Sequence, residues 1–229
     1  MGIVNQGIPA EIALELARLN GSTVFIETGT YHGDTTRWAA QYFEAVYTIE
    51  RSAYLFEQHQ ADLSQLKNVR SYLGDSRDVL PGLLDQLGDR KAIYWLDSHW
   101  SGGETAGERD PCPLLGELAC LAERSQDVIL IDDARLFLSA PHQLHDPAQW
   151  PTIANIAEAL PSATGRMYLQ VIDDVIFAVP NQDPVKSGLV RFAQERSTSF
   201  WIEFSKYQKG KSRLPFLKKI AWSLRRKLR

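Results

Sequence analysis

The sequence predicts an α/β fold built on a mostly parallel sheet. Three observations support this prediction. Apolar runs of strand length alternate with stretches of helical periodicity, a glycine-containing turn follows the first strand, and two strands near the end are separated by two turn-forming residues. At 229 residues, 44% hydrophobic and 23% charged, the chain fits one large globular α/β domain.

The chain is organised around the stretch 23–40. Its apolar run at 24–26 is typical of a strand that is buried on both faces. Gly29 and Gly33 bracket the following turn, where a glycine allows a positive φ or a close approach to a ligand. A helix is expected over 34–43, and its free N–H groups would face the turn. We therefore expect a small ligand to bind here.

The other elements follow in chain order. Predicted strands lie at 45–49, 69–73, 91–96, 128–131, 167–172 and 175–179, and predicted helices at 9–19, 54–66, 77–87, 114–121 and 152–160. The segment 136–151, with two histidines and three prolines, is expected to pass over the edge of the sheet.

The spacing of the first motif separates it from the dinucleotide fingerprint G-x-G-x-x-G. In Glu27-x-Gly29-x-x-x-Gly33 an acid stands two residues before the first glycine. This motif resembles the first motif of class I S-adenosylmethionine-dependent methyltransferases. The hairpin at 167–179 is similar to the end of that family's sheet, where the last strand is antiparallel. The resemblance covers about residues 10–180 and implies a single Rossmann-like domain, with a seven-stranded sheet and helices on both faces.

The resemblance implies S-adenosylmethionine as the cofactor. Glu50 ends the second predicted strand, where nucleoside-binding folds place a carboxylate against ribose hydroxyls. Asp75 follows the third strand and is expected to contact the adenine amino group, to cap the next helix, or to do both. The expected cofactor contacts are Glu27, Gly29, Thr30, Tyr31, Gly33, Thr35, Glu50, Asp75, Ser76 and Asp97.

Three carboxylates follow two strands that are neighbours in such a sheet. Asp97 follows the fourth strand, and Asp132 and Asp133 follow the fifth. Hard oxygen ligands suit Mg²⁺, and the pattern is similar to the metal-dependent O-methyltransferases of the catechol and macrocin type. A bound cation would lower the pKa of an acceptor hydroxyl. Asp97 and His99 are the expected catalytic residues. His99, which follows Asp97 closely on the same loop, is expected to be the base, the alternative being a loop histidine bonded to backbone.

The predicted function is O-methylation of a hydroxyl on a sugar or related polyol, assisted by a divalent metal. The segment 96–103 also looks like bacterial methyltransferases of surface polysaccharide synthesis, which implies a polysaccharide or lipid-linked glycan acceptor. The enzyme alternative is an NAD-dependent sugar oxidoreductase, which the glycine spacing and the terminal hairpin disfavour. The other alternative is a membrane-docked nucleoside-binding module without turnover.

Charge divides the chain into a methyltransferase domain, 1–205, and a basic tail, 206–229. The tail holds ten of the 25 basic residues and none of the 28 acidic ones, so 1–205 carries 15 basic and 28 acidic residues, a net charge of −13. From Arg213 on, apolar residues recur every three or four positions, as in a basic amphipathic helix. We expect an anionic membrane surface as its partner. Nucleic-acid contact and a solvated end are the alternatives.

The remaining expectations concern the compartment and other partners. No run reaches the roughly 18 apolar residues of a membrane span, and the N-terminus does not follow the pattern of a secretion signal. Cys112 and Cys120 give no disulfide framework, which favours a reducing compartment. We expect a cytoplasmic protein, peripheral to the inner face of the membrane, without base-specific nucleic-acid recognition. The oligomeric state, a homo-oligomer included, stays open.

Overall fold

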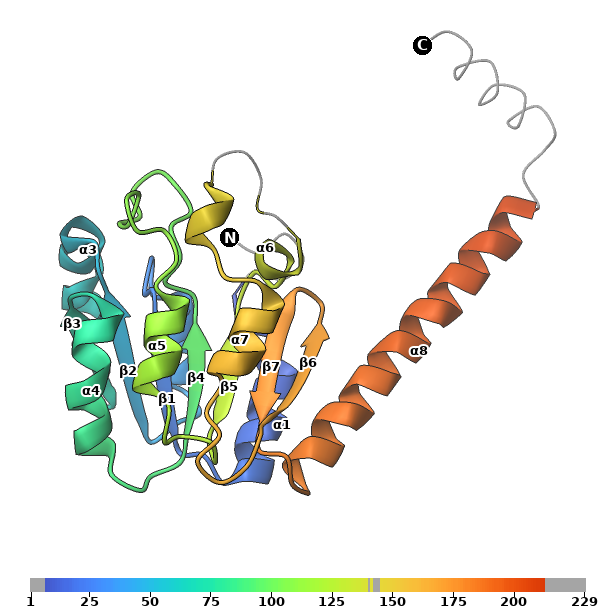
Figure 1. Ribbon diagram of the computed structural model, residues 1–229, viewed down its shortest axis with the longest axis horizontal. Helices are drawn as coiled ribbons and strands as arrows, with labels where there is room; N and C mark the ends of the chain where they lie inside the picture. The colour runs from blue at the N-terminus through green and yellow to red at the C-terminus, as the bar shows by residue number, and fades with distance from the viewer. Residues whose placement is uncertain (1–6, 140, 142–144, 213–229) are drawn as a thin grey trace, which may run out of the picture. The chain divides into compact units, whose positions relative to one another are not determined.

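The computed structural model describes residues 7–139, 141 and 145–212 (Figure 1). The chain divides into two units, Met1–Leu189 and Val190–Arg229, so the boundary lies inside the last helix, α8 (Val185–Ser212). The basic tail from Arg213 on lies outside the described residues. In the part of the chain that is described, no helix has both the length and the apolar character needed to cross a membrane.

One seven-stranded sheet forms the centre of the first unit, in the order β3-β2-β1-β4-β5-β7-β6. The first five strands pair in parallel, whereas β7 is antiparallel to both β5 and β6. This confirms the predicted sheet with its terminal antiparallel hairpin. The strands are β1 (Val24–Thr28), β2 (Ala45–Glu50), β3 (Val69–Leu73), β4 (Ala92–Leu96), β5 (Val128–Ile131), β6 (Tyr168–Ile172) and β7 (Val175–Val179).

Helices lie on both faces of the sheet, as predicted. In Figure 1, α4, α5 and α7 cover the face toward the viewer and α1 lies behind the sheet. The helices of this unit are α1 (Ala10–Asn20), α2 (Asp34–Ala39), α3 (Ala53–Leu63), α4 (Ser76–Leu87), α5 (Leu114–Cys120), α6 (Arg135–Leu138) and α7 (Ile153–Ala159), with a 3₁₀ turn at Pro147–Gln149. The helix expected to reach residue 43 ends at Ala39, because the N–H groups of Gln41 and Tyr42 turn back to carbonyls three residues earlier.

Local side chains fix where several helices begin and end. Ser52 caps α3 by accepting the N–H of Leu55, and Thr152 forms a capping box with Asn155 at the start of α7. Gly21 ends α1 in the left-handed conformation that a glycine adopts without steric cost.

The core lies on both faces of the central strands. Every residue of β1, β4, β5 and β7 is buried, and the largest buried side chains include Trp95, Tyr94, Phe25 and Phe177. Burial of each such side chain stabilises the fold by about 1.5–3 kcal/mol. Because β1 to β5 run in parallel, their carboxyl ends meet at one edge, the upper edge in Figure 1. The polar segments after these strands therefore converge there.

Candidate active site

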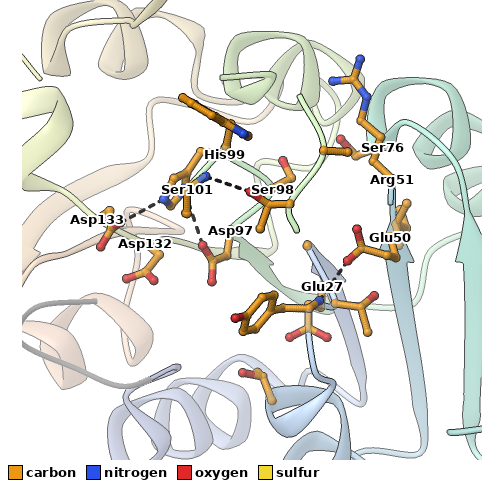
Figure 2. A pocket seen from close by; sticks show the side chains of 18 of the residues that line it. Glu27, Glu50, Arg51, Ser76, Asp97, Ser98, His99, Ser101, Asp132 and Asp133 are labelled. Carbon is orange, nitrogen blue, oxygen red and sulfur yellow. Dashed lines mark hydrogen bonds and ion pairs between the residues drawn. The ribbon is translucent and has the colours of Figure 1, made fainter. Parts of the chain in front are cut away.

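A cavity of about 1190 Å³ opens at the carboxyl edge of the sheet (Figure 2). It exceeds the roughly 300–1,000 Å³ of most small-molecule sites, so it has room for two substrates. Of the residues expected to bind cofactor or metal, or to act as base, all except Gly33 line it: Glu27, Gly29, Thr30, Tyr31, Thr35, Glu50, Asp75, Ser76, Asp97, His99, Asp132 and Asp133.

The turn after β1 packs its backbone directly against the end of β4. Gly29 has a φ of +87°, and a Cβ on it would lie 2.2 Å from the carbonyl oxygen of Asp97. Only glycine fits at this position. Gly33 also has a positive φ, but a Cβ there would meet the side chain of Leu63. Gly33 therefore shapes the turn and does not line the cavity.

Glu27 is a buried carboxyl at the end of β1, 1% exposed. Its Oε2 accepts hydrogen bonds from the hydroxyls of Thr36, on α2, and Thr48, on β2, the latter at 2.8 Å. Burial raises the pKa of Glu27 to about 7, although the threonine hydrogen bonds oppose that shift. Glu27 thus ties two strands and a helix together beneath the cavity.

Glu50 lies at the end of β2 and orders the backbone around the cavity. Its two carboxylate oxygens accept the N–H groups of Tyr31, at 2.9 Å, and Ser52, at 2.7 Å. The bond to Tyr31 supports a residue that has a φ of +49°, which is uncommon outside glycine. Each oxygen keeps a second lone pair, so Glu50 can still accept hydrogen bonds from a ligand.

Asp75 is the N-cap of α4, which confirms one of its two expected roles. It accepts the backbone N–H of Arg77 at 3.0 Å, and the guanidinium of Arg77 at 2.8 and 2.7 Å. The hydrogen bonds from Arg77 hold the pKa of Asp75 below its usual value, despite partial burial. Contact between Asp75 and a cofactor remains a prediction.

Ion pairs join the polar loop 97–113 to the ends of β2 and β3. Arg51 lies 3.5 Å from Asp75 and 3.9 Å from Asp110, and Arg77 contacts both acids. The loop carbonyl of Glu104 also accepts a hydrogen bond from the Ser52 hydroxyl. These contacts hold the loop over one end of the cavity.

A second buried acid lies behind the wall of the cavity. Glu117, on α5, is 1% exposed and accepts the hydroxyl proton of Ser98 at 2.7 Å. Burial raises the pKa of Glu117, whereas hydrogen bonds with Ser76 and Ser98 lower it. Because the Ser98 hydroxyl donates to Glu117, its lone pairs remain to accept a hydrogen bond from a ligand.

His99 bridges two of the expected metal ligands (Figure 2). Its Nε2 lies 2.9 Å from Asp133 and its Nδ1 lies 3.4 Å from Asp97. Burial alone would lower the pKa of His99, but the hydrogen bond to Asp133 and the neighbouring carboxylates raise it overall. The Asp97 side chain is 27% exposed and that of His99 only 6%, so Asp97 is the more accessible group. Within the described residues, the His99 ring contacts these two carboxylates and no backbone group.

The terminal hairpin positions the segment after β5. Asp133 has a φ of +55° and lies 2.7 Å from Arg135, which also pairs with Asp174 in the β6–β7 turn. Asp174 accepts the backbone N–H groups of Ala134 and Arg135, both at 2.8 Å. Although burial would raise the pKa of Asp133, His99 and Arg135 lower it. The antiparallel insertion therefore anchors the acidic end of β5.

The described part of the segment 136–151 packs against this acidic end. Trp150 is buried, and its ring lies 5.8 Å from those of both His99 and Phe137. His145 lies against Trp100 and Trp150 and lines the cavity. Trp150 thus helps to exclude water from His99.

The three expected metal ligands line the same cavity, and His99 and Arg135 contact them. His99 bridges Asp97 and Asp133, and both oxygens of Asp133 are engaged, by His99 and Arg135. The cationic Arg135 also opposes a divalent ion beside Asp133. Among the residues that the structure describes, no group of three histidine, cysteine or acidic side chains is placed to hold a metal ion.

Sequence reasoning missed three residues of this region. Arg51 and Ser98 line the cavity, and Glu117 supports Ser98 from behind. Only Glu117 had a sequence signal, since it is an acid between the apolar residues Leu114 and Leu118 of a helix. The other two contacts depend on loops whose paths the sequence does not specify.

The structure is similar to solved structures of methyltransferases. The O-methyltransferase TomG from Streptomyces achromogenes, in complex with S-adenosylmethionine, is 18% identical, with 78% of this chain and 82% of that chain covered and a TM-score of 0.50. A Staphylococcus aureus protein, provisionally assigned as a caffeoyl-CoA O-methyltransferase, is 14% identical, with 77% and 86% covered and a TM-score of 0.52. Human methyltransferase-like protein 13, in complex with S-adenosylhomocysteine, is 15% identical, with 82% and 88% covered and a TM-score of 0.53.

No protein-family model and no curated protein matches the sequence. The strand order, the antiparallel β7 and the similarity to these structures identify the fold. The chain has the Rossmann-like fold of class I S-adenosylmethionine-dependent methyltransferases.

Substitution Glu27→Gln should reduce the pH dependence of stability. Burial raises the pKa of Glu27 from 4.5 to about 7, so the folded protein retains a proton that the unfolded chain releases between these values. Stability is therefore lost as the pH rises from 4.5 to 7, by roughly 3 kcal/mol for this one group. Urea unfolding at pH 4.5 and pH 8 should show that Glu27→Gln loses less stability than the wild type. An equal loss in both proteins would contradict the prediction, and exposed Glu57→Gln serves as the control.

Proposed function

We propose that this protein is an S-adenosylmethionine-dependent O-methyltransferase that methylates a hydroxyl of a sugar or related polyol. One observation carries the proposal. A cavity at the carboxyl edge of a methyltransferase fold joins a nucleoside-type end, with Gly29 and Glu50, to the interacting side chains Asp97, His99 and Asp133. The first part suits the methyl donor, and the second suits removal of a proton from the acceptor.

The residues at the first end match the polar groups of the donor. Glu50 has lone pairs for two ribose hydroxyls, and Ser98 has lone pairs for the adenine amino group. The turn at Gly29 allows a close approach of ligand to backbone. When bound, S-adenosylmethionine supplies a methyl group that is activated by its sulfonium, so the chain mainly has to place the acceptor oxygen in line.

We assign proton removal to Asp97. As the acceptor oxygen formed its bond to the methyl carbon, the bond from that carbon to the donor sulfur would break, S-adenosylhomocysteine would be released, and the hydroxyl proton would pass to the Asp97 carboxylate. Asp97 is more exposed than Asp133, at the other side of His99. Burial and the charge of Asp132 raise the pKa of Asp97, which favours a base near neutral pH. His99, held by Asp133, stabilises the Asp97 carboxylate from behind. The expected base, His99, becomes a positioning residue in this assignment.

The far end of the cavity suits a polyhydroxylated acceptor. It is lined by Trp100, Arg135 and His145, which together offer an aromatic face and hydrogen-bond donors. Sugars present both ring faces and hydroxyls to such a surface. A terminal sugar of a polysaccharide or of a lipid-linked glycan carries the same chemistry, and both belong to the acceptor class that we propose.

Two rival functions fit the site less well. An NAD-dependent sugar oxidoreductase would need the G-x-G-x-x-G turn, whereas this turn has only Gly29 and Gly33. A nucleoside-binding module without turnover leaves the interacting side chains Asp97, His99 and Asp133 without a role. Binding of the donor without methyl transfer to any hydroxyl acceptor would favour this second rival.

Calorimetry should detect binding of S-adenosylhomocysteine and a contribution from Glu50. Substitution Glu50→Gln keeps an acceptor for Tyr31 but removes charge-assisted hydrogen bonds to ribose, so affinity should fall about tenfold. The matched ligand is the 2′,3′-dideoxy analogue, to which wild type and Glu50→Gln should bind equally. An equal loss with both ligands would show that Glu50 acts only through the protein backbone.

Methyl transfer to a panel of sugars, polyols and catechols should depend on the base. For Asp97→Asn we expect a fall in kcat of roughly 10²–10⁴-fold, because the proton loses its acceptor. For Asp133→Asn we expect a smaller fall, and for Asp132→Asn the smallest, since Asp132 contacts neither His99 nor Arg135 in the interactions described. Equal losses in Asp97→Asn and Asp132→Asn would instead support a shared metal.

Chelation tests the competing route through Mg²⁺. Because the cationic Arg135 lies beside Asp133, we expect that EDTA leaves the rate of methyl transfer unchanged. Loss of activity with EDTA, restored by Mg²⁺, would reinstate the metal and require His99 and Arg135 to move away from Asp133.

A further inference from the structure

Helix α8 carries a cluster of large apolar side chains that are exposed. Five such residues lie within 200–207, and their exposed fractions are 42–64%. The other exposed large apolar residues of the described chain are scattered over the first unit. Contiguous apolar groups on a surface mark an interaction site, whereas single ones do not.

Four of these residues form what we call the aromatic stripe: Phe200, Trp201, Phe204 and Tyr207. Phe204 lies four residues after Phe200 and three after Trp201, and Tyr207 lies three after Phe204, so the four side chains occupy one side of the helix. The distance between ring centroids is 6.3 Å for Trp201 and Phe200 and 5.9 Å for Trp201 and Phe204, so these three rings are contiguous. The fifth residue, Ile202, falls outside this spacing and is exposed on another side.

The charge of the neighbouring sequence identifies the chemistry of the partner. The basic tail, 206–229, begins within the aromatic stripe and holds ten basic and no acidic residues. Exposed aromatic rings followed by lysines and arginines are the composition of segments that lie in a lipid–water interface. A second copy of the chain would place two tails of charge +10 together, which disfavours self-association.

We propose that α8 docks on an anionic lipid surface, with the aromatic stripe inserted among the lipid headgroups and the basic tail bound to their charge. Each signal alone gives marginal, reversible binding, and the two together give stable attachment. Charge alone placed the start of the membrane segment at residue 206. With the aromatic stripe included, the segment begins at residue 200. The proposal does not depend on the methyltransferase activity.

Vesicle co-sedimentation of the full-length protein tests the proposal. The wild type should sediment with vesicles of phosphatidylcholine plus phosphatidylglycerol and not with phosphatidylcholine alone, and 0.5 M NaCl should weaken binding. The double variant Trp201→Ser, Phe204→Ser should bind about tenfold or more weakly, because it loses the apolar contact. The matched control is Ile202→Ser, which removes an exposed apolar residue outside the stripe and should bind within about twofold of wild type. Circular dichroism checks that both variants keep their helix content.

Three results would overturn the proposal. One is absence of binding to the anionic vesicles by the wild type. Another is equal loss of binding in the double variant and in Ile202→Ser, which would remove the role of the stripe. The third is a lipid-free dimer, measured by light scattering, that the double variant dissociates while vesicle binding is unchanged, since the stripe would then be a contact between copies.

Discussion

The close packing of the β1–α2 turn against the end of β4 is the constraint on which the site depends. Gly29 approaches the carbonyl of Asp97 so closely that no Cβ fits between them. This contact places the glycine turn directly beside the loop that carries Asp97 and His99, and all three residues line the cavity. A side chain at residue 29 would separate the two halves of the cavity, so one missing methyl group decides whether they form one site.

Buried carboxyl groups surround this contact, and each is stabilised in a different way. Glu27 accepts threonine hydroxyls, Glu117 accepts a serine hydroxyl, and Asp133 contacts His99 and Arg135. Burial opposes the charge of all three, but only Asp133 has cationic partners that lower its pKa. The site therefore separates acids whose pKa is raised, Glu27 and Glu117, from an acid next to His99 whose pKa is lowered.

The antiparallel end of the sheet has a part in the site as well as in the fold. Because β7 inserts beside β5, the turn before it brings Asp174 against the backbone of Ala134 and Arg135. Arg135 then holds Asp133, and Asp133 holds His99. A sheet without this hairpin would leave the segment after β5 without its anchor.

The sequence by itself determined the order of strands and helices, the terminal hairpin and the convergence of Glu50, Asp97 and Asp133 on one edge. Periodicity and parallel pairing are sufficient for these features, since the strand ends of a parallel sheet meet at one side. Tertiary structure decided how the acids are used. Whether Asp133 faces an ion, a histidine or an arginine depends on the paths of the loop after β4 and of the β6–β7 turn, and on which side chains are excluded from water. Those are contacts between residues distant in sequence, so no local pattern specifies them.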